Sequence, residues 1–157
     1  MEAAYLIDDM TVEIIADGVH LPKPLLQFVY KFKGPDKTAL CTDSMRGAGM
    51  PDGESILGSL KKGQKVIIED GVAKLPDRSA FAGSVATADR LVRTMINVAE
   101  VPLIDAVKMM TTTPARILKI NNRKGSLEIG KDADLTIFDE NINVSHTILE
   151  GNVIYRN

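Results

Sequence analysis

The sequence has few cysteine, histidine and aromatic residues, and each shortage excludes a class of protein. Cys41 is the only cysteine among 157 residues, so no disulfide can form within the chain and a reducing compartment is the simple interpretation. Tryptophan is absent and aromatic residues make up 4% of the chain, which leaves little surface for stacking on nucleic-acid bases. The two histidines, His20 and His146, cannot complete a histidine-rich metal site.

The chain also lacks a charged face and a long apolar run. The formal net charge is −2, from 19 basic and 21 acidic residues, which does not favour a nucleic-acid partner. Residues 1–9 are acidic and contain no long apolar stretch, so this segment is neither a signal peptide nor a membrane span. We therefore expect a cytoplasmic protein with no nucleic-acid or membrane partner.

The first part of the chain predicts a parallel strand–helix–strand unit. Residues 12–16 are an apolar run that ends at a turn, and residues 38–41 are a second run that ends in polar residues. Between them, Pro22 and Pro24 open a helix that Gly34 ends. The apolar face expected for this helix carries Leu25, Phe28, Val29 and Phe32. Both strands should therefore end at the same edge of a sheet.

The rest of the chain predicts a hairpin, further helices and late strands. The pair Asp70 and Gly71 favours a tight turn, which indicates a hairpin insertion at about 63–78. Apolar spacing predicts one helix over 87–100 and another from Pro102, and a third would restart with Thr113 as its N-cap and a proline after it. Short strands are expected at 134–139, 144–150 and 153–155.

Asp43 and His20 are the residues best placed for chemistry. A carboxylate at the C-terminal end of a strand lies where α/β folds place their active sites, although a turn or cap role explains Asp43 equally well. His20 follows Asp17 by three residues, yet a lone loop histidine is more often a hydrogen-bonded surface residue than a catalyst.

Residues 47–53 are glycine-rich but lack the spacing of a dinucleotide loop, and we read them as a flexible loop. The small residues at 82–84 would let backbone approach a ligand, or simply enter a helix.

Four segments occur in one order along the whole chain. Residues 14–20 contain A-D-G-V-H, residues 40–43 end in T-D before a G-A-G loop, and residues 82–84 read A-G-S. Residues 113–135 carry T-P-A and K-G-S-L-E-I-G-K-D-A-D-L, a tail shared with dihydroorotases and aminoacylases. Together these segments resemble the N-acetylglucosamine-6-phosphate deacetylases of the amidohydrolase superfamily, and Ser44 departs from an alanine that is common there.

The resemblance implies a role for each matching residue. It implies that Asp43 is the catalytic acid/base that takes a proton from an activated water and passes it to the departing nitrogen. The products would be acetate and glucosamine 6-phosphate. It implies sugar-phosphate contacts from Asp17, Gly18, Val19, His20, Phe81, Ala82 and Gly83. A divalent metal, zinc or iron, would activate the water in the complete enzyme, but its Glu and His ligands belong to earlier strands. We expect this chain to contribute no metal ligand, to bind no metal and to be inactive alone.

The resemblance also implies a fold. It is α/β, with residues 1–122 forming the C-terminal part of a (β/α)₈ TIM barrel with the hairpin insertion, and residues 123–157 forming C-terminal strands of a small β-sandwich. A TIM barrel needs roughly 250 residues, so we expect the chain to be a fragment of a larger enzyme that is a homodimer when complete. Two alternatives stay open, namely a fragment of an aminoacylase-type or dihydroorotase-type amidohydrolase and a non-catalytic assembly module.

Overall fold

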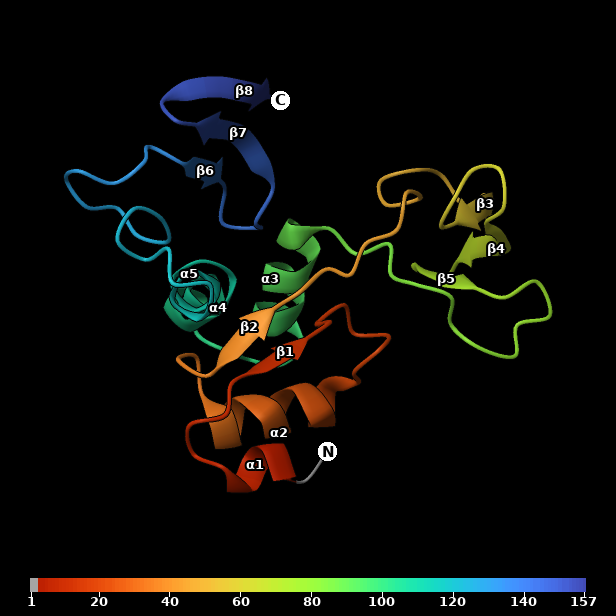
Figure 1. The fold of residues 1–157 in the computed structure, drawn as a ribbon, viewed down its shortest axis with the longest axis horizontal. Coiled ribbons are helices and arrows are strands. Elements are labelled where there is room, and N and C mark those ends of the chain that lie inside the picture. The colour runs from red at the N-terminus through yellow and green to blue at the C-terminus, as the bar shows by residue number, and fades with distance from the viewer. Residues whose placement is uncertain (1–2) are drawn as a thin grey trace.

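A computed structural model describes residues 3–157, in which helices and three small sheets succeed one another along the chain (Figure 1). Residues 1 and 2, the start of the first domain predicted above, lie outside the described residues. The elements are α1 (Ala3–Leu6), β1 (Val12–Ile14), α2 (Lys23–Lys33), β2 (Thr38–Leu40), β3 (Gly53–Leu57), β4 (Gln64–Glu69), β5 (Val72–Lys74), α3 (Ala88–Asn97), α4 (Leu103–Met110), α5 (Thr112–Ile117), β6 (Leu135–Phe138), β7 (Val144–Leu149) and β8 (Asn152–Arg156).

The parallel unit predicted for the first part of the chain is present. β1 and β2 pair in parallel, with Val12 opposite Thr38 and Ile14 opposite Leu40. Pro22 immediately precedes α2, and Gly34, with a φ of 67°, ends it and donates its backbone N–H to the Tyr30 carbonyl. The helix returns the chain to the start of β2, so both strands run in one direction and end at one edge.

The buried face of α2 differs from the predicted one. Leu26 and Val29 enter the core, whereas the side chains of Leu25, Phe28 and Phe32 are 41–59% exposed. Leu25 and Phe28 instead line a groove beside β1, where the ring of Tyr5 packs edge-on against Phe28 at a centroid distance of 4.8 Å. Two overlapping apolar stripes exist on this helix, and contact with the strands selects one of them.

The insertion between β2 and α3 is larger than the predicted hairpin. β4 and β5 form that hairpin, and the φ angles of Asp70 and Gly71, 54° and 73°, show the left-handed pair that an Asp-Gly turn favours. β3, which pairs antiparallel with β4, adds a third strand after the glycine-rich loop. The strand was missed because Gly53 and two polar residues begin it, so its apolar character appears only at residues 56–57.

The helices that follow close the core over β2. α3 and α4 match the predicted helices, but α5 begins earlier than expected. Its N-cap is Thr111, and Thr113 lies inside the helix, fully buried, with its hydroxyl donating to the Pro35 carbonyl at 2.6 Å. That long-range bond explains the difference, because a hydroxyl with a tertiary acceptor is not available for capping.

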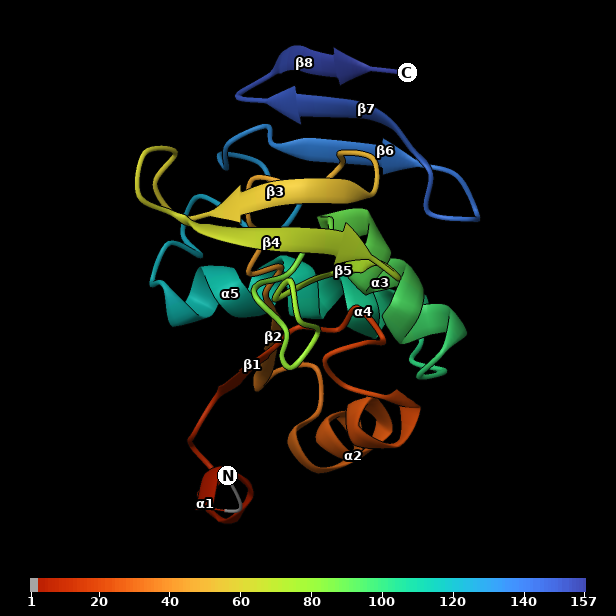
Figure 2. The ribbon, with the colours of Figure 1, turned by 90° about the vertical axis from the view of Figure 1, so that its right-hand side faces the viewer.

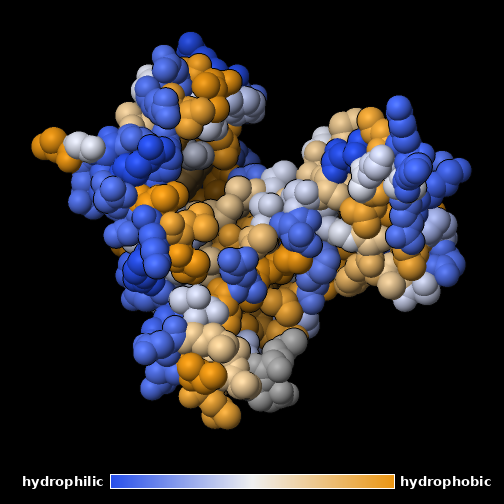
Figure 3. Space-filling model, viewed as in Figure 1, coloured by the Kyte–Doolittle hydropathy of each residue, from blue (hydrophilic) through white to orange (hydrophobic). Residues whose placement is uncertain are grey.

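The last three strands form an antiparallel sheet in the order β6-β7-β8. Its final turn consists of Glu150 and Gly151, with φ of 49° and 80°, so β8 starts at Asn152, one residue before the strand expected at 153–155. This sheet and the insertion sheet lie apart from β1 and β2 (Figures 1 and 2). The hollow between the last sheet, the insertion sheet and the part that contains β1 and β2 is rich in hydrophobic side chains (Figure 3).

The main core joins β1, β2 and helices α2 to α4. Leu26, Leu91, Met95 and Met109 are fully buried in it, together with Leu40 at the end of β2. A second cluster, with Val66 and Ile68 of β4 at its centre, holds the insertion sheet against residues 82–85. No helix among the described residues has the length and apolarity that a membrane crossing requires.

Candidate active site

The C-terminal ends of β1 and β2 place the predicted residues at one edge. Ile14 and Leu40 are paired, and the backbone N–H of Cys41 donates to the Ile14 carbonyl at 2.9 Å, which continues the ladder by one residue. Asp17 and Asp43 each follow the last paired residue of their strand by three positions. Because parallel strands end together, both aspartates lie at the same edge.

Asp17 is a buried carboxylate that organises the loop after β1. Its Oδ1 accepts the backbone N–H groups of Val19 at 2.9 Å and His20 at 2.8 Å, and its Oδ2 lies 2.8 Å from His20 Nδ1. Its side chain is fully shielded from solvent, whereas that of His20 is 19% exposed. Gly18, with a φ of 80°, makes the tight turn possible.

The hydrogen bonds of this loop favour the ionised form of Asp17. Burial acts to raise the pKa of Asp17, but the hydrogen bonds from His20 and Val19 outweigh it and hold the pKa below its ordinary value. An ionised carboxylate can only accept, so Nδ1 of His20 carries the proton of their bond. His20 Nε2 is then the ring nitrogen left for another partner.

Asp43 is exposed at this edge and has no hydrogen-bond or ion-pair partner among residues 3–157. Its φ of 46° lies in the left-handed region, which costs a residue with a Cβ roughly 1–2 kcal/mol. In the described part of the chain six other non-glycine residues share that conformation, so strain alone does not single out Asp43. Its distinguishing property is a free carboxylate at the edge that also holds the Asp17–His20 pair.

Residues 81–84 lie beside Asp43 and connect it with the insertion sheet. Ser44 and Ser84 form a parallel bridge, and the Met45 N–H donates to the Ser84 carbonyl at 2.8 Å. The Phe81 ring lies 5.1 Å from the His20 ring, centroid to centroid. The structure therefore brings Phe81 to His20 and places the A-G-S segment next to the strand end that carries Asp43.

The members of this segment differ in their availability to a ligand. Phe81 is exposed and Gly83, with a φ of 104°, is half-buried. Ala82 is buried in the insertion-sheet core, and its backbone N–H already donates to the Ala73 carbonyl at 2.8 Å. A ligand at this edge can therefore reach Phe81 and Gly83, but it can reach neither the side chain nor the N–H of Ala82.

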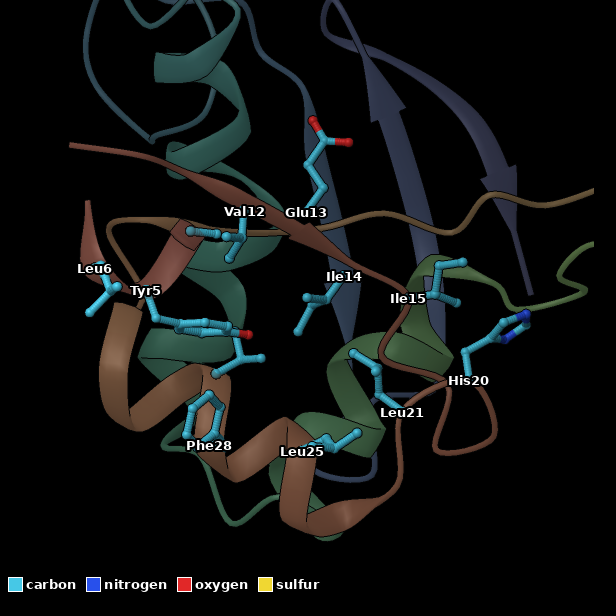
Figure 4. A pocket seen from close by; sticks show the side chains of 12 residues that line it. Tyr5, Leu6, Val12, Glu13, Ile14, Ile15, His20, Leu21, Leu25 and Phe28 are labelled. Carbon is cyan, nitrogen blue, oxygen red and sulfur yellow. The ribbon is translucent and has the colours of Figure 1, made fainter. Parts of the chain in front are cut away.

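An apolar groove of about 630 Å³ runs beside β1 between α1 and α2. Ile14 and Phe28 point into it, His20 lies at one end, and Glu13 extends from the opposite face of the strand (Figure 4). Hydrocarbon lines most of its surface, which does not suit a phosphate group. The polar candidate site is the strand edge itself rather than this groove.

Arg90 is the residue at this edge that the sequence analysis missed. It lies in the first turn of α3, and its guanidinium donates to the Asp17 carbonyl at 3.1 Å and to the Gly71 carbonyl at 2.7 Å. One signal could have found it. A cation in the first turn of a helix opposes the helix dipole, which indicates a partner elsewhere.

The described residues offer no place for a metal ion. No group of three or more His, Cys, Asp or Glu side chains within residues 3–157 is arranged to hold one. Cys41 is a free, half-buried thiol beside the strand end. A divalent metal of the kind expected from the resemblance therefore does not fit the residues present, and no chemical step is assigned to it.

The family model described as the amidohydrolase family matches residues 2–154. The chain belongs to the amidohydrolase family. It is similar to the N-acetylglucosamine-6-phosphate deacetylase of Lysinibacillus sphaericus, with 38% identity over 148 residues. That alignment covers 94% of this chain and 37% of the relative.

Solved structures of amidohydrolases show the same arrangement of elements. The N-acetylglucosamine-6-phosphate deacetylase of Thermotoga maritima superposes with a TM-score of 0.87 at 34% identity, covering 99% of this chain and 41% of that one. A mutant of the Mycobacterium smegmatis deacetylase in complex with N-acetyl-D-glucosamine-6-phosphate gives a TM-score of 0.86 at 30% identity, covering 96% and 39%. The resemblance read from the sequence is thus confirmed, and the α/β fold is that of this family.

Proposed function

We propose that this chain is part of an enzyme that deacetylates N-acetylglucosamine 6-phosphate, and that Asp43 is its proton carrier. The observation that carries the proposal is the free carboxylate of Asp43 at the edge where Asp17 buries its charge to orient His20. The chain spans 37% of its L. sphaericus relative, so the activity concerns the complete enzyme. The amidohydrolase match and the names of the relatives support the substrate class.

The proposed chemistry forms one carbon–oxygen bond, breaks the carbon–nitrogen bond and carries one proton of the water to the nitrogen, while the second water proton leaves with the carboxyl group, which ionises in solution. Water adds its oxygen to the acetyl carbon, the carbon–nitrogen bond breaks, and acetate and glucosamine 6-phosphate leave. Asp43 accepts the proton that the attacking water loses and donates it to the departing nitrogen, which cannot leave as an anion. Its exposure and lack of an ion-pair partner among the described residues leave it free for both transfers.

The proposed substrate contacts lie around the loop after β1. His20 would present Nε2 to the sugar phosphate, with Asp17 holding the ring through Nδ1. Gly18 and Val19 shape the same loop, and Phe81 and Gly83 close it from the side of the insertion sheet. Ala82 would act by packing that sheet.

The proposal also includes the division of the chain into two domains. Residues 1–122 would be the later part of a (β/α)₈ barrel carrying the insertion, and residues 123–157 would be part of a β-sandwich. The short parallel ladder extended by the Ser44–Ser84 bridge supports the barrel. We further propose that the complete enzyme is a homodimer in the cytoplasm, which its single cysteine suits.

The test places this chain in a full-length enzyme. The chain replaces the matched 37% of the L. sphaericus relative, and release of acetate from N-acetylglucosamine 6-phosphate is followed. Asp43→Asn should lower kcat about 10²–10⁴-fold with KM little changed, because Asn keeps the shape but cannot carry a proton. Asp52→Asn, an exposed aspartate of the following loop, is the matched control.

Two results would overturn the proposal. If Asp43→Asn kept more than about a tenth of the turnover, Asp43 could not be the proton carrier. A soluble, folded hybrid that binds the substrate but releases no acetate would contradict the assigned reaction.

A further inference from the structure

The guanidinium of Arg90 joins two segments that are far apart in the sequence. Nη2 donates to the carbonyl of Asp17 in the loop after β1, and Nη1 donates to the carbonyl of Gly71 in the turn between β4 and β5. Neither carbonyl belongs to a paired strand residue, so neither is satisfied by a sheet ladder. Arg90 thereby ties the site loop to the insertion sheet.

The turn at Gly71 is shaped to receive this side chain. A Cβ on Gly71 would lie 3.0 Å from both Nη atoms of Arg90 and 3.3 Å from Cζ. Ordinary carbon contacts need about 3.5 Å or more, so the Nη end of the guanidinium approaches Gly71 more closely than a Cβ there would allow without a shift. Gly71 thus suits the left-handed turn, and a Cβ in its place would push the guanidinium of Arg90 away by a few tenths of an ångström.

A second connection runs between the same two parts. Phe81, which bridges to Lys74 of β5, packs its ring against that of His20 with the two ring planes tilted by 56°. The loop that holds His20 is therefore linked to the insertion sheet in two ways, through Phe81, which bridges to β5, and through Arg90 of α3, which bonds to the turn at Gly71. A shift of the sheet relative to β1 would move His20 unless both contacts broke.

The location of Arg90 argues against a role in the stability of its own helix. A positive charge in the first turn of α3 faces the positive end of the helix dipole, which is unfavourable. Arg93, one turn later, is placed more conventionally, with bonds to Asp89 of its own helix and to the carbonyls of residues 141 and 142. Arg90 makes no bond to a side chain among the described residues and reaches only the two carbonyls.

We propose that Arg90 is a positioning residue that sets the orientation of His20 by fixing the Asp17 carbonyl to the insertion sheet. This inference rests on the proposed function for its consequence, which is tighter binding of the sugar phosphate, but the positioning itself requires no ligand. Its effect should appear in binding rather than in the proton transfers at Asp43.

The first experiment uses the two histidines as reporters in the 157-residue chain. Arg90→Met should shift the imidazole Cε1–H resonance of His20 and raise amide exchange at Val19 and His20 about tenfold, with His146 unchanged. Arg93→Met, the matched control on the same helix, should leave the His20 signal and those amides as they are. Unchanged His20 signals in Arg90→Met, or equal changes in both variants, would overturn the proposal.

A second pair of variants keeps Arg90 and displaces it, in case Arg90→Met does not fold. Gly71→Ala and Gly151→Ala place the same methyl group in two hairpin turns with φ of 73° and 80°. Only the methyl at residue 71 meets Arg90, since no neighbouring atom of residues 3–157 lies within 4 Å of the Cβ position at residue 151. The His20 resonance should move in Gly71→Ala alone, and equal behaviour of the two variants would refute the role of Arg90.

A kinetic comparison separates this proposal from the proposed function. In the hybrid enzyme described above, Arg90→Met should raise KM for N-acetylglucosamine 6-phosphate about tenfold and keep kcat within about twofold. A fall in kcat at unchanged KM would contradict the positioning role. If the unsubstituted hybrid releases no acetate, the proposed function fails, while the NMR result still decides whether Arg90 positions His20.

Discussion

Replacing the buried Asp17 by asparagine should separate the charge of this side chain from its shape. The amide oxygen of the Asp17→Asn variant could still accept the N–H groups of Val19 and His20, but as a neutral acceptor. Hydrogen bonds to charged groups contribute about 1.5–3 kcal/mol and neutral ones about 0.5–1.5, so each of these two bonds should weaken by about 1 kcal/mol. The bond to His20 Nδ1 would survive only if the imidazole changed its tautomer.

The expected loss is about 2 kcal/mol in the free energy of unfolding at pH 7, because burying a neutral amide recovers part of the loss. The loss should depend on pH. The pKa of Asp17 in the folded state lies below its ordinary value. Its contribution to the free energy of unfolding is therefore complete above the pKa of the unfolded state, about 3.9, and disappears as pH falls through the pKa of the folded state. The gap between wild type and variant should therefore close in acid.

Urea unfolding at pH 7 and at pH values below about 4 measures that gap. Asp77→Asn is the matched control, because Asp77 caps a similar turn through Ser79 but is exposed, and its midpoint should not move. If Asp17→Asn were as stable as wild type at pH 7, or if the gap did not narrow in acid, the carboxylate would not be what holds this loop.

Two further predictions follow from the fold and the site. In the hybrid enzyme, His20→Asn should raise KM for the sugar phosphate with a smaller change in kcat, the reverse of Asp43→Asn, and steady-state kinetics on both variants would show whether the roles are separate. Leu26→Ala should cost about 2–5 kcal/mol in urea unfolding, whereas Leu25→Ala on the same helix should cost under about 1, because Leu26 is fully buried and Leu25 is 47% exposed. Equal losses of stability in the two variants would show that the core does not lie on the Leu26 face of α2.

Local signals in the sequence predicted the elements and the shared edge. Two apolar runs separated by a proline-opened helix suffice for parallel strands, and each strand end then places its aspartate at the same edge. The Asp70–Gly71 turn was predicted from two residues because their conformational preference is local. The proximity of Asp17 and His20 likewise follows from their spacing of three.

Features that depend on distant contacts could not be predicted. Either apolar stripe of α2 satisfies helical periodicity, and only the position of β2 selects Leu26. Thr113 carries the signature of a cap, yet the carbonyl of Pro35 removes it from that role. The bridge made by Arg90 requires three segments to meet, and no short window of sequence contains all of them.

The insertion sheet has a consequence for how the chain folds. The Ser44 hydroxyl reaches the carbonyl of Ala86, a partner 42 positions away, and the insertion sheet occupies most of the intervening chain. Its strands pair with sequence neighbours, and hairpins of this kind form in microseconds. Once the hairpins have formed, the flexible loop that must close between Ser44 and Ala86 is shorter. Halving the length of that loop lowers the entropy cost of closing it by about 0.6 kcal/mol. Formation of the insertion sheet should therefore increase the rate at which the segment after Asp43 joins residues 81–86 by roughly threefold.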